Sequence, residues 1–254
     1  MIKLSSVIIT FNEERNIGRC LESLAGIADE IVVIDSGSTD GTESICRSFG
    51  VKFIHHSFDG YSEQKNFAVS QCSFEYILSL DADEALSTEL KDSISALKDN
   101  WEKDGYSFSR LTNYCGKWIH HCGWYPDRKL RLFRKEKGKW SESKLHEKFI
   151  LNDPYNNGFL KGDLLHYSYY TIEDHLNQVN KFTEIAAISD YSNGKRSSLI
   201  LILLKPAIRF IRDYFFHLGL LDGYSGFVIC RISSHASFIK YVKLYQLQKN
   251  KNLN

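Results

Sequence analysis

The segment Tyr76-Ile-Leu-Ser-Leu-Asp-Ala-Asp-Glu84 carries the strongest indication of the fold of this chain. It opens with a mainly apolar run, as in a strand buried inside a sheet, and this run ends abruptly at Asp81 and Asp83. In open α/β sheets, ligands bind just outside the carboxyl ends of the strands. The stretch therefore predicts a buried strand of such a sheet, with two carboxylates at its ligand-binding edge.

The first hundred residues of the chain alternate between short strand-like runs and amphipathic helical segments. Such alternation is typical of a parallel sheet with helices on its faces. Asn12 is expected to cap the first helix, whose apolar residues recur at three- and four-residue spacing up to Leu24. Strands are predicted over 4–10, 30–35, 52–55 and 76–80, and later helices over 40–49, 62–71 and 87–99.

The rest of the chain changes character. Two strand-like segments, 106–110 and 130–134, enclose a loop rich in Trp, His and Gly. A long helix is predicted over 172–191, with Thr171 and Asp174 spaced nearly as in a capping box. The last sixty residues are also predicted to be helical, with breaks at Lys205-Pro206 and at Gly219, Gly223 and Gly226.

Charge is balanced in total but divided along the chain. The 254 residues carry 32 Lys and Arg against 31 Asp and Glu, a net charge of +1, which excludes an overall basic nucleic-acid-binding protein. Residues 195–254 nevertheless carry +8, and the remainder carries −7. A basic, aromatic-rich tail on an acidic body suggests an enzyme held near an anionic surface.

Neither a signal peptide nor a membrane span is predicted. The N-terminal residues run straight into a strand-like segment. The longest apolar run, 199–204, has six residues, against the roughly 18–20 that a bilayer requires. The sequence therefore predicts a cytoplasmic protein.

Polar groups follow three of the predicted strands, and because the carboxyl ends of parallel strands meet at one edge, we expect them to converge on one crevice. Two carboxylates flanking one small residue can hold Mg²⁺ or Mn²⁺, which proteins usually share with substrate phosphates. No Gly-x-Gly-x-x-Gly pattern accompanies them to bind a dinucleotide. The converging residues are Thr10, Asn12 and Glu13 after the first strand, Asp35 at the end of the second, and Asp81 and Asp83.

Four segments in this order closely resemble family 2 glycosyltransferases of the GT-A fold: Val7–Glu14, Val33–Thr42, Gln64–Asn66 and Leu80–Glu84. Later features, His166–Tyr169 and Leu220–Gly223, look like the lipopolysaccharide-core β-1,4-glucosyltransferase subgroup, whose members transfer glucose from UDP-glucose onto inner-core heptose. The resemblance implies an α/β fold, a Rossmann-like mixed sheet flanked by helices. Residues 1–170 would form the transferase domain, with a nucleotide-sugar half at 1–100 and an acceptor half at 101–170. Residues 171–254 would be a helical, basic extension.

The resemblance also implies an activity and roles for the matching residues. The activity is an inverting, metal-dependent transfer of a hexose, glucose from UDP-glucose, onto a lipopolysaccharide inner-core or other lipid-linked glycan. Asp35 would contact uracil or ribose, Lys65 the base or diphosphate, and Asp81 the ribose and cation region. Asp83 would bind Mg²⁺ or Mn²⁺, and His166 would lie near the diphosphate or the metal.

An inverting transfer needs a base that deprotonates the acceptor hydroxyl. Many family members supply it from a Glu-Asp pair, which this chain lacks at the expected place. We assign the base to Glu147, with His146 as its neighbour or an acceptor contact, and Asp127 as the next candidate. Arg131 and its neighbours on the 130–134 strand are candidates for gripping an anionic acceptor or leaving group.

Two other functions are also compatible with the sequence. One is a catalytically inactive module that binds a sugar nucleotide, since the Glu-Asp pair is missing. The other is a sugar-phosphate nucleotidyltransferase, although the Gly-rich loop that cradles a triphosphate is absent. For the basic tail, we expect contact with an anionic membrane on the inner face of the cytoplasmic membrane, and the alternative is a homo-oligomer interface.

Overall fold

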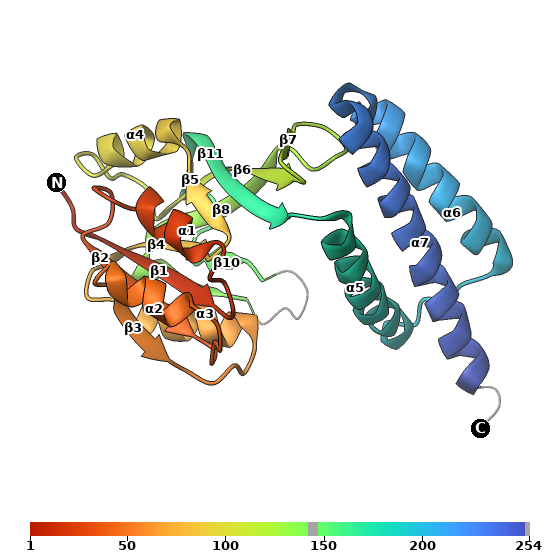
Figure 1. Cartoon of the computed structure of the whole chain (residues 1–254), viewed down its shortest axis with the longest axis horizontal. Helices are drawn as coiled ribbons and strands as arrows, with labels where there is room; N and C mark the ends of the chain where they lie inside the picture. Colours follow the sequence, from red (N-terminus) through yellow and green to blue (C-terminus); the bar gives the residue numbers. More distant parts are fainter. Residues whose placement is uncertain (142–146, 252–254) are drawn as a thin grey trace. The chain divides into compact units, whose positions relative to one another are not determined.

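The computed structural model describes residues 1–141 and 147–251 of the chain. The chain forms two compact units, shown with all elements in Figure 1. The first unit comprises Met1–Leu111 and Asp127–Tyr167, and the second comprises Thr112–Pro126 and Ser168–Asn254. Whether residues 1–170 act as a transferase domain without the remainder stays a prediction.

A mixed sheet is the frame of the first unit. Its strands follow the order β3-β2-β1-β4-β8-β6-β11-β5, with β7 paired to β6. The first four in this order are mutually parallel, and β8 then pairs antiparallel with both β4 and β6. The predicted parallel α/β sheet is therefore confirmed. The strands are β1 (Leu4–Thr10), β2 (Glu30–Asp35), β3 (Lys52–His55), β4 (Tyr76–Asp81), β5 (Glu84–Leu86), β6 (Gly105–Tyr114), β7 (Lys117–Ile119), β8 (Asp127–Arg134) and β11 (Asn157–Tyr169).

Side chains of the central strands alternate between two cores, as the two-residue repeat of a strand requires. Val7 faces one core and Ile8 the other. The core around Ile8 is closed by α1 (Ile17–Ser23), α2 (Thr42–Ser48) and α4 (Thr88–Leu97). The core around Val7 is closed by α3 (Tyr61–Ser70) and by the hairpin of β9 (Gly138–Trp140) and β10 (Phe149–Leu151). Helices therefore cover both faces of the parallel strands and leave their carboxyl ends for the loops.

The prediction that Asn12 caps the first helix is wrong. The helix begins at Ile17 after Asn16, and Asn12 has a positive φ of 55°. Its side-chain oxygen accepts a hydrogen bond from the Thr39 backbone N–H at 2.8 Å. Asn12 thus joins the loop after β1 to the loop after β2, because its short amide side chain tolerates the left-handed conformation and reaches a neighbouring backbone group.

Three helices make up most of the second unit: α5 (Ile172–Ser192), α6 (Leu199–Ile211) and α7 (Gly223–Lys251). Figure 1 shows α7 running beside both of the others. Two short turns, a π-helical one at Arg212–Phe216 and a 3₁₀ one at Gly219–Asp222, join α6 to α7. The predicted capping box of Thr171 and Asp174 at the start of α5 is confirmed.

Two of the predicted helix breaks are wrong. Pro206 lies inside α6, where packing against α7 supports the helix and the Pro206 carbonyl accepts a hydrogen bond from Ser234 Oγ. Gly226 lies inside α7, and a Cβ there would come within 1.9 Å of the Gly219 carbonyl oxygen. Gly226 therefore permits close approach of the preceding turn rather than ending the helix. In the described part of the chain, no helix is long and apolar enough to cross a membrane.

Candidate active site

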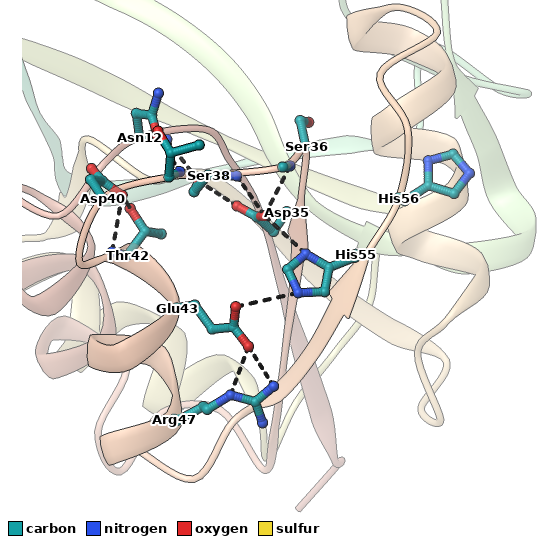
Figure 2. Close-up of polar contacts among 12 residues, drawn as sticks. Asn12, Asp35, Ser36, Ser38, Asp40, Thr42, Glu43, Arg47, His55 and His56 are labelled. Carbon is teal, nitrogen blue, oxygen red and sulfur yellow. Dashed lines mark hydrogen bonds and ion pairs between the residues drawn. The ribbon is translucent and has the colours of Figure 1, made fainter.

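Asp35, the last residue of β2, is a buried hub for the loop that follows it (Figure 2). Its Oδ2 atom accepts hydrogen bonds from the backbone N–H groups of Gly37 and Ser38, each at 2.9 Å. The Ser38 hydroxyl donates to Oδ1, and His55 Nδ1 lies 3.2 Å from Oδ2. His55 Nε2 in turn lies 3.4 Å from Glu43, so a short polar chain runs from the end of β2 across β3 to α2.

Hydrogen bonds connect the loop after β1 to the loop after β2. The Asn12 N–H donates to Ser38 Oγ and the Glu13 N–H to Thr42 Oγ1, both at 2.8 Å. Asp40 accepts from Thr42, as expected of a residue at a helix start, and also from the backbone of Glu14. Because backbone groups make most of these bonds, the two loops form one rigid rim at the carboxyl edge of the sheet.

Asp81, at the end of β4, is clamped by two buried cations. Lys65 Nζ lies 2.8 Å from Oδ1, and Arg131 donates to Oδ2 at 2.6 Å. The two cations are only 1% and 5% exposed. Desolvation on its own raises the pKa of Asp81, but the charges of Arg131 and Lys65 outweigh it and hold this pKa well below its ordinary value. Asp81 is therefore an anion at any physiological pH.

The indole ring of Trp140 packs against both cations. Its centroid lies 4.6 Å from Lys65 Nζ and 5.4 Å from the guanidinium carbon of Arg131. Glu84, also buried, accepts a hydrogen bond from the Asp81 N–H and one from Arg131. Within the described residues, the Nε and Nη1 atoms of Arg131 have no hydrogen-bond partner. The guanidinium thus keeps donor capacity beside the Asp81 carboxylate.

Asp83 and His166 form the second charged pair of the site. Asp83 Oδ2 lies 3.1 Å from His166 Nε2, and the Tyr167 N–H donates to the Asp83 carbonyl, which fixes the turn against β11. Burial raises the pKa of Asp83, but the pairing with His166 outweighs it and lowers this pKa overall.

Glu13 lies close enough to Asp83, Asp40 and Asp81 for their negative charges to act on it. Burial raises its pKa, the negative charges of Asp83, Asp40 and Asp81 raise it further, and a hydrogen bond from Asn16 opposes the change. The edge of the sheet therefore concentrates negative charge around Glu13 and Asp83. Such a cluster is stabilised by a cation, although no three His, Cys, Asp or Glu side chains within 1–141 and 147–251 are placed to hold a metal alone.

Glu147 reaches the site from the segment before β10. Its Oε1 atom lies 3.3 Å from Lys65 Nζ, so Lys65 bridges Glu147 to Asp81. His146 lies outside the described residues. The alternative base, Asp127, is held by Arg110 at 2.8 Å and by Lys129 at 3.1 Å.

Apart from His146, which lies outside the described residues, the structure thus brings the predicted site residues to one edge of the first unit's sheet. Thr10 ends β1 there, buried, and its carbonyl accepts from the Ser36 N–H. Sequence reasoning missed His55, Glu43, Glu84 and Trp140, and it placed Arg131 on a candidate anion-binding face rather than against Asp81. One available signal was the position of Glu84 directly after the Asp81–Asp83 pair.

The family described as "Glycosyl transferase family 2" matches residues 5–153, which include the parallel strands from Ser5 onward and every residue of the site except His166. The chain belongs to glycosyl transferase family 2. It is therefore a glycosyltransferase, and the GT-A type of α/β sheet that the resemblance implied is confirmed.

Named relatives cover nearly the whole chain. It is 33% identical to "Lipopolysaccharide core biosynthesis glycosyltransferase LpsC" of Rhizobium meliloti, over 96% of this chain and 93% of that protein. It is 31% identical to "Uncharacterized glycosyltransferase RT0209" of Rickettsia typhi, over 100% and 90%. Among solved structures, S. aureus TarS 1–349 is similar at 16% identity and a TM-score of 0.49, over 98% of this chain and 92% of that one.

Proposed function

We propose that this enzyme is an inverting, metal-dependent transferase that moves glucose from UDP-glucose onto a lipopolysaccharide inner-core or similar lipid-linked glycan. One observation carries the proposal. At the carboxyl edge of the sheet, the pair Asp83–His166 lies beside a clamped Asp81, and Lys65 connects Asp81 to Glu147. A cation-binding pair and a base candidate on one edge are what such a transfer requires.

The nucleotide is assigned to the rim formed by the loops after β1 and β2. Thr10, Asn12 and Glu13 lie on the first loop and Asp35 organises the second. We assign uracil and ribose to this rim, with Asp35 acting through the N–H groups and the His55 ring that it holds. Lys65 and Asp81 would lie toward the ribose and diphosphate.

The donor set of Asp83 and His166 suits a divalent cation that is shared with a diphosphate. One carboxylate and one imidazole leave most of the coordination sphere open, and Mg²⁺ or Mn²⁺ commonly fills such positions with phosphate oxygens. When bound, the cation offsets the charge that develops on the departing diphosphate. The lowered pKa of Asp83 keeps its carboxylate ionised for this task.

Glu147 is assigned as the general base. In the transfer, the acceptor hydroxyl oxygen bonds to the anomeric carbon, the bond from that carbon to the diphosphate oxygen breaks, and the hydroxyl proton passes to Glu147. Lys65 pairs with the Glu147 carboxylate and also with Asp81, and so helps to hold Glu147 in place. Asp127 is a weaker candidate because two cations already hold its carboxylate. His146, next to Glu147, is assigned to the acceptor.

The acceptor assignment rests on sequence similarity. A relative named for lipopolysaccharide core biosynthesis is 33% identical over 96% of the chain, and this supports a core glycan as acceptor. Because such acceptors are carried by lipid, we also propose that the basic residues 195–254 keep the enzyme on the cytoplasmic face of the inner membrane.

A donor screen tests the proposal. UDP-hexoses are incubated with Mg²⁺ or Mn²⁺ and purified core-truncated lipopolysaccharides, and the released UDP is measured. We expect UDP release that requires UDP-glucose, the cation and an acceptor together. Tight UDP binding without turnover would instead favour the inactive module, and pyrophosphate release from UTP and a sugar phosphate would favour the nucleotidyltransferase.

A further inference from the structure

Helix α6 exposes most of its large apolar side chains. Ile202 is buried where α6 packs against α7, whereas six other apolar side chains of the helix are 48% to 71% exposed, with Leu203 and Ile211 at the edge of the groove between α6 and α7. These six recur mainly at three- and four-residue intervals and form one broad apolar stripe that covers roughly half of the helix circumference. This stripe, called here the α6 stripe, consists of Leu199, Ile200, Leu203, Leu204, Ile208 and Ile211.

The charged groups exposed near the α6 stripe are cations. Lys205, Arg209 and Arg212 follow the same spacing along a neighbouring line of the helix and are exposed. The carboxylates of 195–251 point inward: Asp213 is 1% exposed and pairs with Arg209 and Arg212, and Asp222 is 3% exposed and accepts from the His121 backbone. Folding thus removes the anions from this surface and leaves apolar and basic groups.

Helix α5 in the same unit shows a different surface. It also exposes apolar side chains, among them Leu176, Phe182 and Ile188, at 39% to 50%. However, Glu173 and Glu184 are exposed on the same helix. Of α5 and α6, it is α6 that combines an apolar stripe with a basic border.

We propose that the α6 stripe inserts into the interface of an anionic lipid bilayer. Soluble proteins rarely expose so many contiguous apolar side chains, and an apolar helix face bordered by Lys and Arg is typical of helices that lie in the membrane plane. The basic border would contact anionic headgroups. With 13 residues, and with no described helix able to span a bilayer, α6 lies in the surface rather than crossing it.

A second copy of the chain is a less favourable occupant. A two-fold dimer through the α6 stripe would place the same surface on both sides of the interface, and Lys205, Arg209 and Arg212 of each copy would border it without exposed carboxylates to pair with. The inference narrows the membrane contact proposed for residues 195–254 to one face of one helix. Its test does not depend on sugar transfer.

Vesicle flotation with the full-length protein tests this inference. The vesicles contain phosphatidylcholine alone or mixed with phosphatidylglycerol. The stripe variant is L203E/L204E/I208E, and the matched control is L176E/F182E/I188E, which adds the same charge at exposed apolar positions of α5. Circular dichroism and light scattering establish that all three proteins are folded and report their oligomeric state.

We expect the wild-type protein and the α5 control to float with the anionic vesicles, and the stripe variant to lose about 10-fold or more in binding. Failure of the wild-type protein to bind anionic vesicles would overturn the inference, as would an equal loss in both variants. A wild-type dimer that the stripe variant converts to a monomer, without vesicle binding by either, would show that the stripe is an interface between copies.

Discussion

His166 pairs with the Asp83 carboxylate and helps to set its orientation. The 3.1 Å pairing orients the Asp83 oxygens and contributes to its lowered pKa. If Asp83 and His166 hold a cation, we expect His166→Gln to raise the Mn²⁺ concentration for half-maximal activity about 10-fold. Losing a metal ligand, or the residue that orients it, usually weakens metal binding by this amount or more. Titration of the rate with Mn²⁺ measures this. His235→Gln, on an exposed histidine of α7, should leave the curve unchanged, and an unchanged curve for His166→Gln would remove it from the metal site.

Glu147 and Asp127 can be separated by matched amide substitutions. Glu147→Gln keeps the shape of the side chain but cannot take a proton, so we expect the kcat to fall by about 100-fold or more with little change in UDP affinity. Asp127→Asn weakens the contacts with Arg110 and Lys129 but should leave most of the activity. Steady-state kinetics on the two variants, with UDP titrations alongside, measure both effects. The reverse order of activities would assign the base to Asp127.

The sequence predicted most of the acidic residues of the site, but it missed Glu43, Glu84 and the contacts that the carboxylates make. Asp81 and Asp83 follow a buried strand, so their place at the edge was readable from the local pattern. The ion pairs of Asp81 with Arg131 and Lys65 could not be predicted in this way, because both cations lie far from Asp81 in the sequence. They reach it only when β8 pairs with β4 and α3 packs on the sheet. The position of His55 beside Asp35 likewise depends on the register of β2 with β3.

Strand β8 contributes a buried arginine, Arg131, and a half-buried one, Arg134. Arg131→Met leaves the Asp81 and Glu84 carboxylates without this cation, and we expect it to lower the free energy of unfolding by about 3 kcal/mol. Arg134→Met removes a contact with Glu75 at the surface, which contributes less than about 1 kcal/mol. Urea denaturation followed by circular dichroism compares them. Equal losses would mean that the clamp is not a buried ion pair.

Helix α5 carries a pH-sensitive group. His175 is packed among Tyr114, Trp124 and Tyr169, and burial lowers its pKa from 6.5 to about 4. The unfolded chain therefore takes up this proton at higher pH than the folded chain. Stability from this residue is complete above about pH 6.5 and is lost as the pH falls toward 4, by up to about 3 kcal/mol.

The variant His175→Asn isolates this contribution, since the amide can still contact the Tyr114 hydroxyl but does not titrate. Between pH 6.5 and 4, the free energy of unfolding of the wild-type protein should fall more steeply than that of the variant. Parallel curves would show that His175 takes up its proton while folded.

The helices and strands themselves were largely predictable. The errors concern a helix cap and a helix break, which depend on contacts with residues far away in the sequence. The strand and helix alternation of the first hundred residues is periodic enough to place β1 to β4 within a residue or so. Asn12 is of a residue type that often caps helices, but its side-chain oxygen accepts a hydrogen bond from the Thr39 backbone N–H instead. Pro206 is a helix breaker by type, yet α6 continues through it because α7 supports one side.

The net charge of the whole molecule is a sum of two opposed parts. The acidic part contains the edge at which Glu13, Asp81 and Asp83 lie, and the basic part contains α6 and its border of Lys205, Arg209 and Arg212. Composition was enough to predict this division. Composition could not show that Asp213 and Asp222 are buried. Because they are, the surface of the basic part carries a more positive charge than the net charge of its residues indicates.

The proposed transfer requires the carboxyl edge of the sheet to bind uridine diphosphate through a cation held by Asp83. Calorimetric titration with UDP, in the presence and absence of Mn²⁺, measures this binding. We expect Mn²⁺ to tighten UDP binding to the wild-type protein and to Asp92→Asn, which changes an exposed carboxylate on α4, but not to Asp83→Asn. Equal enhancement of UDP binding by Mn²⁺ in Asp83→Asn, or no enhancement in the wild-type protein, would contradict it.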